Sequence, residues 1–304
     1  MMEKNLKNEL NKSELYASYK DNTDVFLTNE QIYKIFEKFW EENCSKLKSE
    51  DNPKLFIIAA QPGSGKTGLV SRIESQHKIP ILTGDNYRIY HPNYKMFFDT
   101  QNFSKFTHPL NLTMCRLSIA RCLDRHISFI MENPLKNPLQ NAEYIVNGNN
   151  LEFKVNFYIM AVKKNDSFLG TYYRLAKFIE VGTGARETTH KTHDECYDGI
   201  SKSLELKESI SKLNSLKLFN RNLEPIFEAN ISSSNVNTIC LEAKKSLIAE
   251  RNRPYTKEEV EELEKQKNFV LDYIDKGLIT VISKDDFLKE YESRKEKKSN
   301  DKLY

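Results

Sequence analysis

The eight residues from Ala60 to Thr67 (AQPGSGKT) restrict the fold more than any other part of this chain. They follow the apolar run 55–59 (LFIIA), which is typical of a buried parallel strand, and they lead into 68–73 (GLVSRI), which has the pattern of a helix. In such a strand, glycine loop and helix, the glycines let successive backbone N–H groups point at phosphate oxygens, and the helix N-terminus adds partial positive charge. The stretch therefore predicts a loop that binds the phosphates of a nucleotide.

The loop fits the pattern G-x-x-x-x-G-K-[ST] at every position but the first. Ala60 stands where a glycine is usual, and we count this as a mild departure because a small residue fits there. Lys66 is expected to reach the β- and γ-phosphates, and the Thr67 hydroxyl is expected to ligate Mg²⁺. The alternative, a glycine-rich turn that binds nothing, is disfavoured by the strand and helix on either side. The expected phosphate-binding residues are Gln61, Pro62, Gly63, Ser64, Gly65, Lys66 and Thr67.

Charge and cysteine usage narrow the class of protein further. The chain has 304 residues and a net charge of +3, without the strong basic excess that a nucleic-acid-binding protein would show. Its five cysteines are widely spaced and form no C-x-x-C pair, so we expect buried free thiols in a reducing compartment. We expect no signal peptide and no membrane span, which makes the cytoplasm the default location.

The rest of the chain alternates strands and helices. Further buried strands are predicted at 79–82, 127–132 and 153–162, and helices at 110–125, 167–181 and 189–206. The segments 217–220 and 225–228 predict a hairpin at the edge of the sheet. This order predicts an α/β fold of the P-loop kinase type, with a doubly wound, mostly parallel sheet and helices on both faces.

Three regions are expected along the chain: a polar, weakly structured arm at 1–26, a kinase domain at 27–250 and a charged helical extension at 251–304. Capping boxes predict helix starts at Thr28 and Thr256. The first of these helices should bury Ile32, Ile35, Phe36, Phe39 and Trp40, and the second should bury Val260, Leu263, Phe269, Val270, Tyr273 and Ile274. The basic run 295–298 is expected to be a solvated face.

Two carboxylates are expected at the edge of the sheet where ligands bind in α/β folds. Asp85 follows the second strand and Glu132 ends the third. Asp85 is a candidate base for a hydroxyl, although a loop aspartate is more often a helix cap. Arg174 lies on the helix after the fourth strand, and Arg186 lies in 182–186, which we expect to act as a lid. Arginines on a closing lid can neutralise a transferred phosphate, so these residues favour phosphoryl transfer over hydrolysis.

Six stretches in collinear order resemble the zeta toxins, the kinase components of epsilon/zeta toxin–antitoxin systems. They are 61–67 (QPGSGKT), 84–88 (GDNYR), 91–94 (HPNY), the strand and helix within 158–174, the lid region 185–194 and the hairpin residues 218–221 (LFNR). The resemblance covers the chain from about Leu27 to about Glu228.

This resemblance implies ATP-dependent phosphorylation of the sugar 3′-hydroxyl of UDP-N-acetylglucosamine, which blocks cell-wall synthesis, with ATP and Mg²⁺ as cofactors. It implies that Lys66 and Thr67 hold the ATP phosphates and Mg²⁺, and that Arg174 and Arg186 contact the transferred phosphate. The implied substrate-binding residues are Asp85, which takes the hydroxyl proton, Tyr87, Arg88, His91 and Glu132. Asn220 and Arg221 would approach the base of ATP. A small helical antitoxin covering the ATP site is the implied partner, and neither nucleic acid nor membrane is expected to bind.

The chain departs from the family at its acceptor side. Asn133 and Pro134 follow Glu132 where the family usually has Gly and Thr. Proline lacks an N–H donor and restricts the residue before it, so the acceptor pocket is expected to be reshaped. Two alternatives therefore stay open. One is a small-molecule kinase for another hydroxyl, such as that of an antibiotic or another nucleotide, and the other is a nucleotide-binding switch without transfer.

Overall fold

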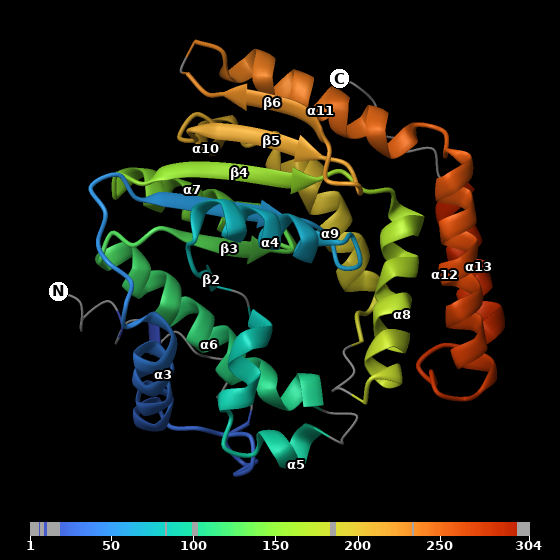
Figure 1. Cartoon of the computed structure of the whole chain (residues 1–304), viewed down its shortest axis with the longest axis horizontal. Helices are drawn as coiled ribbons and strands as arrows, with labels where there is room; N and C mark the ends of the chain where they lie inside the picture. The colour runs from blue at the N-terminus through green and yellow to red at the C-terminus, as the bar shows by residue number, and fades with distance from the viewer. Residues whose placement is uncertain are drawn as a thin grey trace.

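A six-stranded sheet with helices on both faces forms the centre of the molecule (Figure 1). The computed structural model describes residues 6, 9–10, 19–82, 84–98, 103–182, 187–232 and 234–296. The strand order is β2-β3-β1-β4-β5-β6, with every neighbouring pair parallel except the antiparallel hairpin of β5 and β6. The strands are β1 (Lys54–Ala59), β2 (Ile81–Leu82), β3 (Phe129–Asn133), β4 (Lys154–Met160), β5 (Ser215–Phe219) and β6 (Pro225–Asn230). The predicted mostly parallel sheet and its edge hairpin are confirmed.

The strand before the phosphate loop is buried on both faces. Leu55 and Ile57 of β1 pack into the larger core, which lies against α3, α6 and α7, while Phe56 and Ile58 point to the other face and pack with residues of α4. Since successive side chains of a strand point to opposite faces, a strand covered on both sides must be apolar throughout. This explains the continuous run LFIIA.

The helices and the 3₁₀ turn η1 connect these strands. In chain order they are α3 (Asn29–Cys44), α4 (Lys66–His77), η1 (Gly84–Tyr90), α5 (Tyr94–Phe98), α6 (Phe103–Asp124), α7 (Pro138–Asn150), α8 (Lys164–Glu180), α9 (His190–Ser203), α10 (Lys207–Ile210), α11 (Val236–Asn252), α12 (Lys257–Asp275) and α13 (Lys284–Glu296). The capping boxes at Thr28 and Thr256 are confirmed. Trp40 is buried as expected, with the Arg121 guanidinium over its ring.

Two long helices were not predicted. The sequence of α7 is rich in Asn and contains Gly148, residue types that favour turns over helix interiors. A Cβ at Gly148 would lie 3.0 Å from the end of the Leu55 side chain in the sheet, so the glycine helps α7 to pack closely against the sheet. In α11 the buried residues Val236, Ile239, Cys240, Ala243 and Leu247 recur at helical spacing, which is a signal that the sequence does carry.

The two ends of the described chain pack more closely than their composition suggests. Leu6, Leu10 and Val25 of the polar arm are buried, although most of residues 1–18 lie outside the described ranges. In the extension, α12 and α13 pack against α8 and form a third apolar cluster, which includes Phe168, Leu263 and Phe287 (Figure 1). The prediction that Val260 lies on the buried face of α12 is wrong, because this residue is 47% exposed. The buried face begins one turn later, at Leu263.

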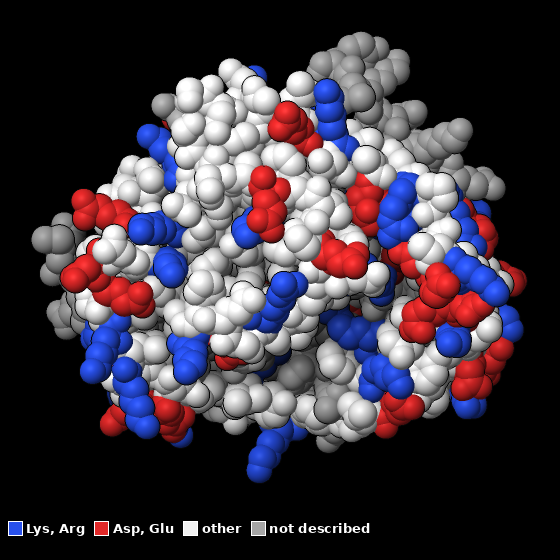
Figure 2. Space-filling view, turned by 45° about the horizontal axis from the view of Figure 1, so that its top comes forward, with Lys and Arg blue, Asp and Glu red and all other residues white. Residues whose placement is uncertain are grey.

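The surface and the thiols agree with the sequence. Lys and Arg side chains alternate with Asp and Glu over the face drawn in Figure 2, without a large field of one sign. All five cysteines are free, and all but Cys115 are buried. Among the described residues, no helix is both long and apolar enough to cross a membrane.

The phosphate loop packs directly on α8. Gly63 has a φ of +77°, and a Cβ there would lie 2.0 Å from the carbonyl oxygen of Ser167. A Cβ on Gly170 would in turn lie 2.2 Å from the carbonyl oxygen of Gly63. These contacts are between backbones, so neither partner can rotate away.

We therefore expect Gly170→Ala to destabilise the protein by about 1–3 kcal/mol, the usual cost of overpacking. Gly68→Ala in α4 is the matched control: its new Cβ would meet only the end of the Leu223 side chain at 3.3 Å. Alanine should there gain about 0.5–1 kcal/mol of helix propensity. Urea unfolding of both variants measures the difference, and equal free energies of unfolding would contradict the proposed close contact.

Candidate nucleotide-binding and catalytic site

The loop between β1 and α4 has the geometry of a phosphate cradle. Gly65 is the N-cap of α4 with a φ of +85°, and no atom lies within 4 Å of the place where a Cβ would be. No side chain caps α4, so its first N–H groups are not used by a capping residue. The buried Ser64 hydroxyl has no hydrogen-bond partner within the described part of the chain, so it can donate to a phosphate oxygen. These residues fit the triphosphate of ATP.

Lys66 and Glu132 form an ion pair at the carboxyl edge of the sheet. Their side chains lie 3.3 Å apart and are 20% and 18% exposed. Glu132 belongs to β3, where it is in register with Ile58 of the strand that leads into the loop. Thr67 is exposed in the first turn of α4, so its hydroxyl is accessible. Protein sites bind Mg²⁺ through few side chains together with substrate phosphates and water, and an accessible Thr67 fits this chemistry.

Asp85 and Arg186 stay predictions. The backbone of Asp85 lies in η1, just beyond the end of β2 and hence at the same edge of the sheet as Glu132, but its side chain is outside the described parts. Arg186 and the predicted lid residues 183–186 also lie outside the described residues.

The other residues expected around Asp85 are buried. The ring of Tyr87 packs edge-on against Phe39, with ring centres 4.9 Å apart. Arg88 donates to the Thr107 hydroxyl at 2.6 Å and to the Ser104 carbonyl at 3.0 Å, both in α6. His91 is 2% exposed and accepts the backbone N–H of Asn93 at 3.1 Å. All three side chains are buried in this structure, and Tyr87 and Arg88 hold η1 against α3 and α6.

Arg174 lies on α8, one turn beyond Gly170, which touches the phosphate loop. Residues four apart lie on the same face of a helix, so Arg174 is on the face that meets the loop. Its guanidinium lies 3.3 Å from the Thr188 hydroxyl, just after the predicted lid. The structure thus brings Arg174 near both the loop and the lid segment.

The turn between β5 and β6 lies over the start of α4. Arg72 of α4 donates to the Leu223 carbonyl at 2.9 Å. Asn220 serves the turn itself, because its side-chain oxygen accepts the backbone N–H of Asn222 and Glu224 and its amide donates to the Glu224 carboxylate at 2.7 Å. Arg221 is half-buried, and its Nη1 has no hydrogen-bond partner among the described residues. Arg221 is therefore the better placed of the two to meet a nucleotide.

A sequence model of one family, described as zeta toxin, matches residues 40–231, which is more than half of the chain. The chain belongs to the zeta toxin family. Toxin zeta of Streptococcus agalactiae is 26% identical over 240 residues, which cover 75% of this chain and 80% of that protein. Toxin zeta of Enterococcus hirae is 27% identical over 242 residues, with 76% and 82% covered.

A solved structure confirms the fold. It comes from the PezAT chromosomal toxin–antitoxin system of Streptococcus pneumoniae and superposes with a TM-score of 0.66. The sequences are 16% identical, and the alignment covers 82% of this chain and 99% of that one. The family match ends at residue 231, before α11, so the helices α11, α12 and α13 of this zeta toxin family member lie beyond it.

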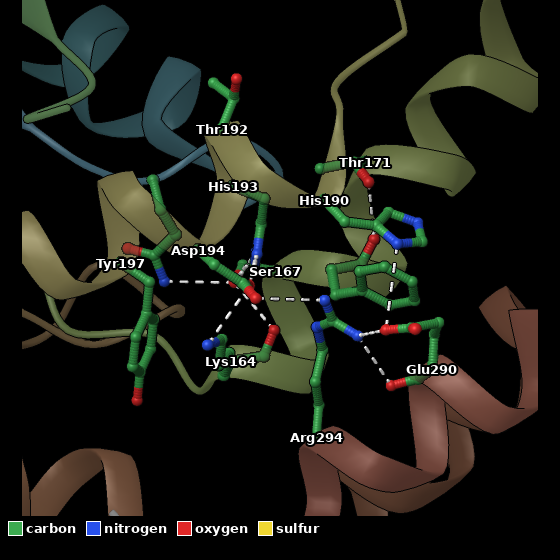
Figure 3. A network of polar contacts seen from close by, with 12 residues as sticks. Lys164, Ser167, Thr171, His190, Thr192, His193, Asp194, Tyr197, Glu290 and Arg294 are labelled. Atoms are coloured by element: carbon green, nitrogen blue, oxygen red, sulfur yellow. Dashed lines mark hydrogen bonds and ion pairs between the residues drawn. The ribbon is translucent and has the colours of Figure 1, made fainter.

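A buried polar network connects the phosphate loop to α13, and Figure 3 shows its members on α8, α9 and α13. Gln61 donates to the Ser167 hydroxyl at 3.2 Å, which lies 2.9 Å from Nε2 of His193, and Nδ1 of His193 lies 3.0 Å from Asp194. Since the carboxylate only accepts, Nδ1 carries the proton and Nε2 accepts from Ser167. Asp194 also pairs with Lys164 and with Arg294 of α13, each at 3.3 Å.

The pKa values of His193 and Asp194 are both lowered, but for different reasons. Burial lowers the pKa of His193, which outweighs the nearby Asp194 carboxylate, so the ring stays neutral. Burial opposes the charge of Asp194, but the hydrogen bond from His193 and the charges of Lys164 and Arg294 lower its pKa to about 2. The neutral His193 ring thus links the charged groups of Lys164, Asp194 and Arg294, through Ser167, to the uncharged side chain of Gln61 in the phosphate loop.

We expect the free energy of unfolding to fall as the pH drops from about 7 to 5. The unfolded chain protonates its histidines near their ordinary pKa of about 6.5, whereas the folded protein holds the pKa of His193 lower. The stability that the neutral His193 ring provides is therefore fully present above about pH 6.5. It is lost as the pH falls below that value, by at most about 1.4 kcal/mol per pH unit.

His193→Gln should make this slope shallower. His77 and His91, whose pKa values burial also lowers, would cause the slope that remains. Asp194 titrates too low to contribute in this range. Urea unfolding at several pH values tests the prediction, and an unchanged slope in the variant would refute it.

Proposed function

We propose that this chain is a kinase that transfers the γ-phosphate of ATP to the sugar 3′-hydroxyl of UDP-N-acetylglucosamine or a related UDP-amino sugar. The observation that carries the proposal is the ion pair of Lys66 and Glu132 beside the phosphate cradle. In this proposal Lys66 holds the transferred phosphate, and Glu132, whose carboxylate lies beside it, binds the acceptor hydroxyl.

Each residue has a defined task in this proposal. ATP, bound with Mg²⁺, supplies the phosphoryl group. The N–H groups at the start of α4 and the Ser64 hydroxyl bind phosphate oxygens, and Thr67 holds the metal. Lys66 and Arg174, together with Arg186 of the lid, neutralise charge on the transferred group. Asp85 accepts the proton of the acceptor hydroxyl.

The acceptor side is supported by family membership and by Glu132. Asn133, which follows it, turns its side chain away toward α7: its oxygen accepts the N–H of Leu135 at 2.8 Å and its amide donates to Asn141 at 3.0 Å. Asn133 therefore serves the turn after β3. Because this residue departs from the family pattern beside Glu132, it favours a second candidate function in which another hydroxyl compound is the acceptor.

Purified protein incubated with ATP, Mg²⁺ and a panel of nucleotide sugars should add one phosphate to UDP-N-acetylglucosamine, which mass spectrometry detects. Asp85→Asn should lower kcat by about 10²–10⁴-fold, the usual contribution of a general base. Its affinity for ATP should remain, since the phosphate loop is intact. Asp198→Asn, an exposed position of α9, is the matched control and should keep full activity.

The outcomes separate the three hypotheses. Transfer only to another hydroxyl compound would support the second candidate and rule out the UDP-amino sugar. ATP binding without transfer to any acceptor would support a nucleotide-binding switch. An Asp85→Asn variant as active as the wild type would remove Asp85 from the role of base.

We propose further that a small helical antitoxin binds this chain and covers the ATP site. Support comes from the relative in the PezAT toxin–antitoxin system, whose fold this chain shares. Such a partner and ATP would exclude each other, so saturating ATP should raise the Kd of the complex at least tenfold. Lys66→Met, which weakens ATP binding, should reduce this effect. A Kd that ATP leaves unchanged would contradict the proposed position of the antitoxin.

A further inference from the structure

A cationic cavity lies between the N-terminus of α8, α9, the end of α11, the segment before α12, and α13. Its volume is about 460 Å³, within the range of small-molecule sites. None of the residues that line it is Asp or Glu, and none belongs to the phosphate loop, α4 or β3. Six of them are cationic: Lys163, Lys164, Arg251, Arg253, Arg294 and Lys295. The last four lie beyond the family match, so this cavity depends on the extension.

Four of these cations have carboxylate partners outside the cavity. Lys164 and Arg294 share Asp194 (Figure 3), Arg253 pairs with Glu250 and Glu259, and Lys295 pairs with Glu292 at 2.9 Å. These partners hold the cationic groups in place. These carboxylates also reduce the net charge of the walls. A cation without such a partner would therefore attract an anionic ligand most strongly.

Lys163 is the group that points to a ligand. It is 8% exposed, and its ammonium nitrogen has no hydrogen-bond partner within the described ranges. It lies over the face of the Tyr255 ring, 3.3 Å from the ring centre, and the nearby Asp166 carboxylate also favours its charge. A buried ammonium that keeps its charge without hydrogen bonds is costly, and an anion in the cavity would supply them.

The end of α8 adds a second source of positive potential. Lys163 is the N-cap of this 17-residue helix, and no side chain caps it. The Asn165 amide nitrogen, in the first turn, also lacks a hydrogen-bond partner among the described residues, and Asn165 is buried. A helix N-terminus with a buried lysine and a free amide beside it is suited to phosphate oxygens.

We propose that this cavity binds a small phosphorylated metabolite, separately from the ATP site. Both tyrosine rings in its wall already have a cation on one face: Lys163 lies over Tyr255, and the Arg251 guanidinium lies 3.7 Å from the centre of the Tyr197 ring. The cavity therefore suits a polar body, such as a sugar, more than a stacked base. The ligand class is a sugar phosphate or a similar phosphate monoester.

The test uses glucose 1-phosphate and inorganic phosphate as probes. The full chain carrying Lys66→Met serves as the background, because this substitution weakens phosphate binding at the nucleotide loop. Isothermal titration calorimetry should show one remaining site for glucose 1-phosphate. Adding Lys163→Met should weaken that site at least tenfold, whereas adding Lys267→Met, which removes a lysine of α12 outside the cavity, should leave it unchanged.

A surface variant covers the case in which Lys163→Met fails to fold. Asn252 lines the cavity and is exposed, so Asn252→Glu places a negative charge at the site without disturbing the core. It should also weaken binding at least tenfold, in contrast to Asn147→Glu on the exposed face of α7. Equal binding by Asn252→Glu and Asn147→Glu, or no binding at millimolar probe, would overturn the proposal. The proposal would also be overturned if an acidic peptide bound to the cavity and neither phosphate probe did. Loss of kinase activity in any variant leaves this result unaffected.

Discussion

The contact between the backbones of Gly63 and Gly170 determines how the rest of the site is built. A Cβ at either glycine would overlap backbone atoms of the other segment, so the phosphate loop and α8 form one rigid unit. The buried side chain of Gln61 reinforces it, because its amide donates to the Val162 carbonyl and to Ser167. Arg174 is carried by the same helix. The Gly63–Gly170 contact thus positions both the loop proposed to bind phosphate and Arg174, which is proposed to act on that phosphate. Sites built on such rigid elements keep their geometry.

This arrangement makes α8 depend on the C-terminal extension. The sides of α8 away from the loop are apolar, with Phe168 and Tyr172 packed against Phe287 of α13. Without α12 and α13 these residues would be exposed to water. The Arg294–Asp194 pair adds a polar link, which continues through His193 and Ser167 to the loop (Figure 3). Although the extension lies beyond the family match, it belongs physically to the support of the nucleotide site.

Local sequence patterns allowed much of the fold and the phosphate loop to be predicted. The contacts between segments far apart in the sequence could not be predicted from such patterns. The strands, the capping boxes and the phosphate loop each depend on neighbouring residues, and the structure has them where they were expected. Tyr87, Arg88 and His91 were expected to bind substrate, yet they pack inward, because α3 and α6 cover η1. The network of Gln61, Ser167 and His193 joins residues more than 100 positions apart, and no spacing in the sequence indicates it. The turn-forming composition of α7 concealed a helix that the sheet stabilises.

The ion pair of Lys66 and Glu132 joins the two halves of the proposed site. Both side chains are mostly buried, so neither charge can be left alone at low cost. In the proposed reaction, phosphate oxygens would become partners of Lys66, and the acceptor hydroxyl would become a partner of Glu132. Changes beyond Glu132, at Asn133 and Pro134, can then alter which hydroxyl is presented without moving Lys66, because that side chain is fixed by the loop and α4. In this proposal acceptor choice depends on the end of β3, whereas the position of the phosphate loop depends on its contact with α8.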